Sequence, residues 1–90
     1  MYQLIFSRQA KEDLLRLKKD EPQAFKKASK LLAELVDHPF TGSGKPEALK
    51  GNRSGQWSRR ISQKHRLVYE VIENEVQVYI LSSYGHYDDK

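Results

Sequence analysis

The stretch Gly55–Val71, GQWSRRISQKHRLVYEV, predicts a β-hairpin at the centre of the fold. Large apolar residues recur at alternate positions on both halves, as in strands with one buried face. These residues are Trp57, Ile61, Leu67, Tyr69 and Val71. Arg60 and Arg66 take the positions between them, so we expect both on the uncovered face. Arg59 falls on the side of Trp57 and Ile61, where we expect its long side chain to reach the sheet edge.

The N-terminal third predicts a short strand followed by two helices. Residues 2–6 alternate as a strand. Ser7 is a typical N-cap for a helix whose apolar stripe contains Ala10, Leu14 and Leu17, widened by Leu15. Asp20 is the expected N-cap of a second helix, with Pro22 in its first turn and Pro39 beyond its end.

The remaining segments predict short strands and turns. The run HPFTGSGKPE, residues 38–47, has the glycine and proline content of a loop. A short strand is expected at Ala48–Lys50. Near the C-terminus, Val76, Val78 and Ile80 alternate on a last strand after a tight IENE turn.

This order of elements predicts a single α+β domain over residues 1–90. Helices followed by consecutive antiparallel strands are expected to cover one face of the sheet. We therefore predict a strand and a two-helix hairpin on one face of a mainly antiparallel sheet of about four or five strands. The other face, with Arg60 and Arg66, is left open.

The positive charge is concentrated in one segment of the chain. The formal net charge is +4, but residues 45–66 contain seven basic residues and one acid, Glu47. A local cationic surface suits an anionic partner, most commonly a phosphate backbone, although a solvated basic surface is the simpler alternative.

Several classes of protein are disfavoured. No apolar run reaches the length of a membrane span, the first residues do not resemble a signal peptide, and there is no cysteine. The histidines lack metal-ligand spacing, so we expect no metal site and no cofactor. GSGK lacks the length of a phosphate-binding loop, and no serine nucleophile elbow is present.

The residues that remain form an acid–base set for phosphate chemistry. RNA can be cut by attack of its own 2′-hydroxyl when a protein supplies a base, an acid and cations. Glu47, Lys50, Arg60, Arg66, His86 and Tyr87 provide those groups. Many basic domains contain such residues, so a non-catalytic RNA-binding module is an alternative.

Four blocks of the sequence resemble a known family. GKPEALK, WSRRI and HRLVY within residues 44–71, followed by HY at 86–87, are similar to the YoeB (Txe) toxins of the RelE superfamily. The resemblance implies a bacterial, cytoplasmic toxin of a toxin–antitoxin pair that cuts mRNA in the ribosomal A site. It also implies a YefM/Phd-type antitoxin, operator DNA contacts only through the toxin–antitoxin complex, and a possible homodimer.

The same resemblance implies roles for individual residues. Glu47 would be the general base and His86 the general acid. Lys50, Arg60 and Arg66 would hold the scissile phosphate, and Tyr87 would orient the nucleotide or stack on it. Within the basic segment we also expect Lys45, Arg53 and Arg59 to contact the substrate. We expect His38 and His65 to be structural or idle, and Trp57 to belong to the core.

Overall fold

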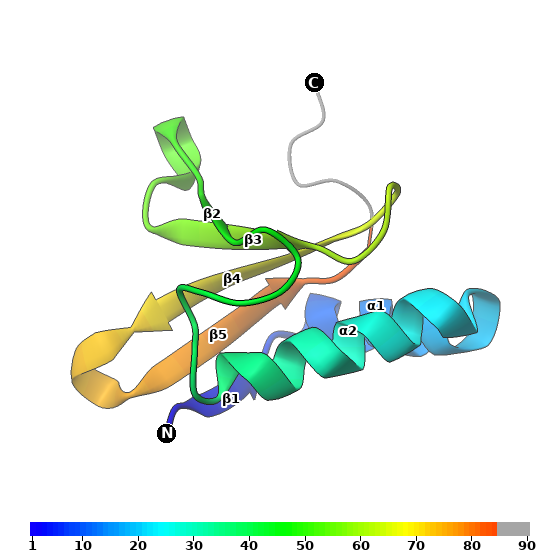
Figure 1. The fold of residues 1–90 in the computed structure, drawn as a ribbon, viewed down its shortest axis with the longest axis horizontal. Coiled ribbons are helices and arrows are strands. Elements are labelled where there is room, and N and C mark those ends of the chain that lie inside the picture. Colours follow the sequence, from blue (N-terminus) through cyan, green and yellow to red (C-terminus); the bar gives the residue numbers. More distant parts are fainter. Residues whose placement is uncertain (85–90) are drawn as a thin grey trace.

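The computed structural model describes residues 1–84, which form two helices and a five-stranded sheet (Figure 1). In chain order the elements are β1 (Gln3–Phe6), α1 (Arg8–Asp20), α2 (Pro22–Leu35), β2 (Glu47–Ala48), η1 (Gly51–Arg53), β3 (Gln56–Arg60), β4 (Arg66–Ile72), η2 (Glu73–Glu75) and β5 (Gln77–Ser82). Within residues 1–84 no helix is long and apolar enough to cross a membrane.

The sheet has the strand order β1-β5-β4-β3-β2. β1 runs parallel to β5, and the other neighbouring pairs are antiparallel. Both helices lie on the same side of this sheet (Figure 1). The predicted α+β architecture, with a mainly antiparallel sheet and one covered face, is therefore confirmed.

The predicted hairpin is the β3–β4 pair. Trp57 stands opposite Tyr69, and Arg59 stands opposite Leu67. Tyr69 and Leu67 are fully buried, and Trp57 packs against the same core, with its ring centroid 5.1 Å from that of Phe40. The alternation in Gly55–Val71 thus predicted the inward face correctly.

The helices cover this face with small and branched apolar side chains. Ser7 caps α1 as expected, because its Oγ accepts a hydrogen bond of 3.0 Å from the Ala10 N–H. Ala10 and Leu17 are fully buried, whereas Leu15 is 68 % exposed and does not widen the buried stripe. The buried residues of α2 are Ala24, Ala28, Leu31 and Leu35.

The start of α2 differs from the prediction. Asp20 is the last residue of α1, and Glu21 occupies the N-cap position of α2 without a side-chain capping bond. Instead, Glu21 Oε2 lies 2.8 Å from His65 Nε2 and 3.3 Å from Lys64 Nζ. The Glu21 side chain therefore joins the helix junction to the tip of the β3–β4 hairpin, and the expected capping role of Asp20 is wrong.

His65 has a structural role, as expected. Its side chain is almost completely buried, and its hydrogen bond to Glu21 is the main cause that lowers the pKa of that carboxyl, with Lys64 adding to it. The turn itself is closed by Ser62 Oγ, which accepts from the N–H groups of Lys64 and His65.

Two strand boundaries also differ. The short strand is Glu47–Ala48 rather than Ala48–Lys50, and Lys50 precedes the turn η1. Val76 lies outside β5, with φ 54°, because the chain needs a left-handed residue to leave η2. An alternation pattern does not reveal such a backbone conformation.

Candidate functional site

The sheet face away from the helices, called the open face here, carries two adjacent rows of predicted site residues. Its middle is less open than predicted, because Ser58 and Val68 are each 1 % exposed. Glu47 on β2 stands opposite Ser58 on β3, which in turn stands opposite Val68 on β4. In the next row Arg60 stands opposite Arg66. Because directly opposite residues share a face, the structure places Glu47, Arg60 and Arg66 on the same side of the sheet.

The spacing of these rows suits a small anion. Opposite Cβ atoms in antiparallel pairs are about 4.5–5.5 Å apart, and diagonal neighbours about 7–8 Å. Arg60 is a diagonal neighbour of Glu47, since Glu47 is paired with Ser58. A carboxylate and two guanidinium groups at such separations can surround a phosphate, with the carboxylate on one side and the cations on the other.

Backbone hydrogen bonds fix β2 against β3 on both sides of Glu47. The Arg60 N–H donates to the Gly44 carbonyl at 2.7 Å, and the Leu49 N–H donates to the Gln56 carbonyl at 2.9 Å. Lys45, between these contacts, has φ 51°. The course of the chain just before Glu47 is therefore set by β3 itself.

Arg59 does not reach the sheet edge. Its side chain is fully buried and forms an ion pair of 3.0 Å with Glu34 of α2. The expectation that Arg59 reaches the sheet edge is wrong. Each nitrogen of its guanidinium donates to an acceptor of the protein itself, so the group has no donor left for a substrate. The physical reason is that a buried charge is stable when it is paired and hydrogen-bonded, and the loop after α2 supplies those partners.

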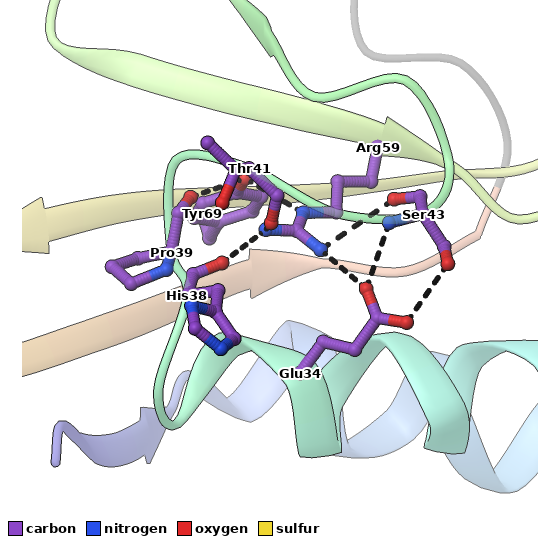
Figure 2. Close-up of polar contacts among 7 residues, drawn as sticks. All are labelled: Glu34, His38, Pro39, Thr41, Ser43, Arg59 and Tyr69. Carbon is purple, nitrogen blue, oxygen red and sulfur yellow. Dashed lines mark hydrogen bonds and ion pairs between the residues drawn. The ribbon is translucent and has the colours of Figure 1, made fainter.

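Figure 2 shows how the loop closes around this guanidinium. Nη2 donates to the carbonyls of His38 and Thr41, and Nη1 donates weakly to that of Ser43. Nε donates to the Tyr69 hydroxyl at 3.0 Å, and that hydroxyl donates to the Pro39 carbonyl at 2.9 Å. One inward-facing side chain thus holds residues 38–43, directly before the segment that carries Glu47.

Glu34 fastens the same loop from the helix side. Its Oε1 accepts from the Ser43 N–H, and its Oε2 accepts from the Ser43 hydroxyl, both at 2.8 Å. These two bonds, followed by the charge of Arg59, lower the pKa of Glu34. Gly42 is required here, because a Cβ atom at its position, with φ 124°, would lie 2.6 Å from Glu34 Oε1.

The other predicted substrate contacts are peripheral. Lys45 and Lys50 are exposed on either side of β2, and neither belongs to the paired rows of the open face. Arg53 lies in η1, where its Nη1 donates to Gln56 Oε1 at 2.9 Å. These three residues surround the edge strand, whereas Glu47, Arg60 and Arg66 lie within the sheet.

His86 and Tyr87 lie outside the described residues. The chain that leads to them is anchored on α1, because the buried N–H of Ser83 donates to Asp13 Oδ2 at 2.9 Å. The ring of Tyr84 lies between Arg16 and His65, with 4.2 Å from its centroid to the Arg16 guanidinium carbon and to the His65 ring centroid.

The part of the chain that the structure describes, residues 1–84, shows no second candidate site beside the rows of the open face. No group of three or more His, Cys, Asp or Glu side chains gathers in this part of the chain as a metal centre would require. A hollow of about 430 Å³ beside α1 and one of about 210 Å³ beside β5 are both mainly apolar. Neither is lined by a predicted site residue.

Sequence reasoning missed two features of this region. An arginine at an inward-facing strand position signals a buried partner, and that signal was present at Arg59. Ser58 was not among the predicted site residues, although its register puts it opposite Glu47.

Comparisons with known proteins agree with this fold. Residues 6–87 match the family described as YoeB-like toxin of bacterial type II toxin-antitoxin system. Toxin YoeB of Escherichia coli strain K12 is 41 % identical over 75 residues, which cover 83 % of this chain and 89 % of that protein.

Solved structures give the same result. A YoeB–YefM toxin–antitoxin heterotetramer from Staphylococcus aureus contains a chain 39 % identical with TM-score 0.81, covering 97 % of this chain and 99 % of that one. A YoeB dimer from the same organism has 38 % identity and TM-score 0.82, with 96 % and 98 % covered. The chain therefore belongs to the YoeB family of toxins of bacterial type II toxin–antitoxin systems.

Proposed function

We propose that this toxin is a ribosome-dependent endoribonuclease that cuts mRNA in the A site and so inhibits translation. The observation that carries the proposal is the register of the open face, where Arg60 and Arg66 stand opposite each other beside Glu47. A base next to two cations on the sheet face away from the helices meets the needs of phosphate cleavage by the substrate's own 2′-hydroxyl.

The proposed reaction needs no nucleophile from the protein. The Glu47 carboxylate takes the proton from the 2′-hydroxyl, and the resulting oxygen attacks the adjacent phosphorus. The bond from phosphorus to the 5′-oxygen breaks, and His86 gives that oxygen a proton. The products are a 2′,3′-cyclic phosphate and a 5′-hydroxyl, while Arg60 and Arg66 stabilise the charge that builds up on the phosphorane.

The remaining predicted residues take supporting roles in this proposal. Lys50, Lys45 and Arg53 attract the message to the β2 edge, since contacts with backbone phosphates need only charge. Tyr87 orients or stacks on the nucleotide. Arg59 is left out of the substrate contacts because its donors are already bonded to Glu34, Tyr69 and the loop carbonyls.

The proposed partners follow from the family. The YoeB–YefM complex from Staphylococcus aureus supports a YefM-type antitoxin as the partner of this chain. The toxin would then contact operator DNA only as part of the toxin–antitoxin complex. The YoeB dimer from that organism supports a homodimer. Ribosome and mRNA are the proposed targets of the free toxin.

The deciding experiment is an assay with purified ribosomes programmed with a defined message. Wild-type toxin should produce new message ends within the A-site codon that carry a cyclic phosphate. Glu47→Ala and His86→Gln should reduce single-turnover cleavage by at least about 100-fold. Glu12→Ala, which removes an exposed carboxylate on α1, is the matched control and should cut normally.

Two outcomes would contradict the proposal. Full cleavage by Glu47→Ala would remove the assigned base, and an unchanged pH profile in His86→Gln would remove the assigned acid. Tight ribosome binding by the wild-type toxin without any new message ends would favour the non-catalytic RNA-binding alternative.

A further inference from the structure

Ser58 has a buried hydroxyl that lacks a partner in the described part of the chain. Its residue is 1 % exposed, and no hydrogen-bond partner for Oγ is present among residues 1–84. Buried hydroxyl groups in folded proteins are nearly always bonded, because an unpaired one keeps the full cost of leaving water. A serine retained in this state needs an explanation.

The position of Ser58 provides one. It lies in the middle of β3, opposite Glu47 on one side and Val68 on the other. Arg60, two positions further along the strand, shares its face. The unpaired hydroxyl therefore lies on the sheet face away from the helices, within the rows that hold Glu47 and Arg66, although Ser58 and Val68 are each only 1 % exposed there.

A second unpaired donor lies in the adjacent row. Arg66 Nε is also buried and has no partner within residues 1–84. The N–H of a guanidinium can only donate a hydrogen bond, so the partner that this group lacks must be an acceptor. A serine hydroxyl can donate as well, and one acceptor group with several oxygens satisfies both donors at once.

We propose that Ser58 is a further substrate-binding residue, whose Oγ–H donates a hydrogen bond to a non-bridging oxygen of the RNA phosphate that Arg66 also binds. This inference rests on the proposed function, because it assigns Ser58 to that same site. A phosphate group is the favoured ligand because its oxygens are strong acceptors and two guanidinium groups share the face. Within residues 1–84 the hydroxyl has no partner, and in the proposed complex a phosphate oxygen supplies one.

This role has a signature that a structural role lacks. If Ser58 only supported the fold, Ser58→Ala would lower stability and binding together. An unpaired buried hydroxyl does the opposite, since its removal relieves the desolvation cost of the ligand-free protein. Ser58→Ala should therefore unfold at an unchanged or higher denaturant concentration while binding RNA more weakly.

Ser83 offers a matched control. Its Oγ is also buried and unpaired within the described residues, but it follows β5, where its N–H is bonded to Asp13 of α1. Ser83→Ala makes the same chemical change outside the paired rows that contain Glu47 and Arg66. Ser58→Thr keeps a hydroxyl at this position, so it tests whether a hydroxyl is sufficient for RNA binding.

The experiment measures binding separately from cleavage. The free toxin and its variants are titrated with a short 2′-O-methyl RNA oligonucleotide, which cannot be cut, and saturation is followed by nuclear magnetic resonance. Ser58→Ala should weaken binding about tenfold, as expected for one hydrogen bond to a charged group. Ser83→Ala should bind within about twofold of wild type, and Ser58→Thr should restore most of the affinity.

The outcomes separate this inference from the proposed function. Binding by Ser58→Ala within about twofold of wild type, or no saturable binding by wild type, would overturn the role of Ser58. A lower denaturation midpoint in Ser58→Ala would also overturn it, because the hydroxyl would then support the fold. Failure of wild-type toxin to cut messages on ribosomes would instead overturn the proposed function, and the binding comparison would still decide on Ser58.

Discussion

Arg59 Nη1 lies 3.0 Å from Glu34 Oε1, and this ion pair joins the middle of the sheet to the last turn of α2. The loop between α2 and β2 passes over the two groups and bonds to both (Figure 2). The pair therefore holds the segment that delivers Glu47 to the open face, although neither residue lies on that face.

Replacement of Glu34 should destabilise the fold strongly. Glu34→Ala leaves the buried guanidinium of Arg59 without its carboxylate and the Ser43 N–H without its acceptor. We expect a loss of about 3 kcal/mol or more in the free energy of unfolding, measured by chemical denaturation. Glu12→Ala, an exposed change on α1, should alter this free energy by less than about 0.5 kcal/mol. Equal effects in the two variants would contradict the importance of the ion pair.

The same pair predicts an acid-dependent loss of stability. Hydrogen bonds from Ser43 and the charge of Arg59 hold the pKa of Glu34 below its usual 4.5. The native state thus favours the charged carboxylate, so its stabilisation is present above pH 4.5 and is lost as the pH falls through the lowered pKa. Denaturation midpoints measured from about pH 6 to pH 3 should fall less steeply in Glu34→Gln than in wild type. Parallel curves would show that Glu34 is not the group responsible.

Substitution by lysine should affect different properties at the two neighbouring arginines of β3, namely stability at Arg59 and cleavage at Arg60. Arg59→Lys replaces a forked guanidinium, which serves several acceptors, by a single ammonium group, and it should cost about 2 kcal/mol of stability or more. Arg60→Lys lies on the exposed face and should leave the free energy of unfolding within about 0.5 kcal/mol of wild type. On programmed ribosomes, however, Arg60→Lys should cut more slowly. A stability loss in Arg60→Lys equal to that in Arg59→Lys would refute the assignment.

Tyr69 should behave as a buried, hydrogen-bonded phenol. Tyr69→Phe leaves Arg59 Nε and the Pro39 carbonyl unpaired, which should cost about 1–3 kcal/mol. Burial raises the pKa of Tyr69 above its usual 10.0, so the native state favours the neutral phenol, and this stabilisation is lost as the pH rises through the raised pKa. In an ultraviolet titration of the native protein, Tyr69→Phe should remove a tyrosine that ionises above pH 10. An unchanged late phase would count against this interpretation.

The anchor at the end of β5 should affect both stability and cleavage. Asp13→Ala removes the acceptor of the buried Ser83 N–H, which should cost about 1–3 kcal/mol in the free energy of unfolding. Ser83 lies three positions before His86, so cleavage measured where the variant is still folded should also fall. Asp20→Ala, an exposed acid on the same helix, should change neither property. Normal cleavage by folded Asp13→Ala would show that this anchor does not matter for catalysis.

The fold was largely predictable because apolar residues recur at every second position in its central hairpin. Trp57, Leu67 and Tyr69 lie on the covered face as that period requires. The errors lie where backbone geometry interrupts the pattern. Val76 takes a left-handed conformation at a turn, and the capping position expected at Asp20 falls on Glu21 instead, whose side chain bonds to a distant hairpin tip.

The candidate site was predictable in part for the same reason. Arg60 and Arg66 were expected on one face, and their direct pairing confirms it. The burial of Ser58 was not predictable, because the amount of water that reaches a side chain depends on everything packed around it. Its unpaired hydroxyl became visible only when the hydrogen bonds of the folded chain were known.

By itself, the sequence determined the hairpin, the side of the sheet on which Arg60 and Arg66 lie, and the family motifs, because these depend on alternation and order along the chain. Only the tertiary structure decided that the Arg59 side chain is buried and paired with Glu34. Its main partners outside the hairpin lie 16 to 25 residues away, on α2 and on the loop after it. Whether an inward-facing guanidinium escapes to water or stays buried depends on such distant partners, and here they surround it completely.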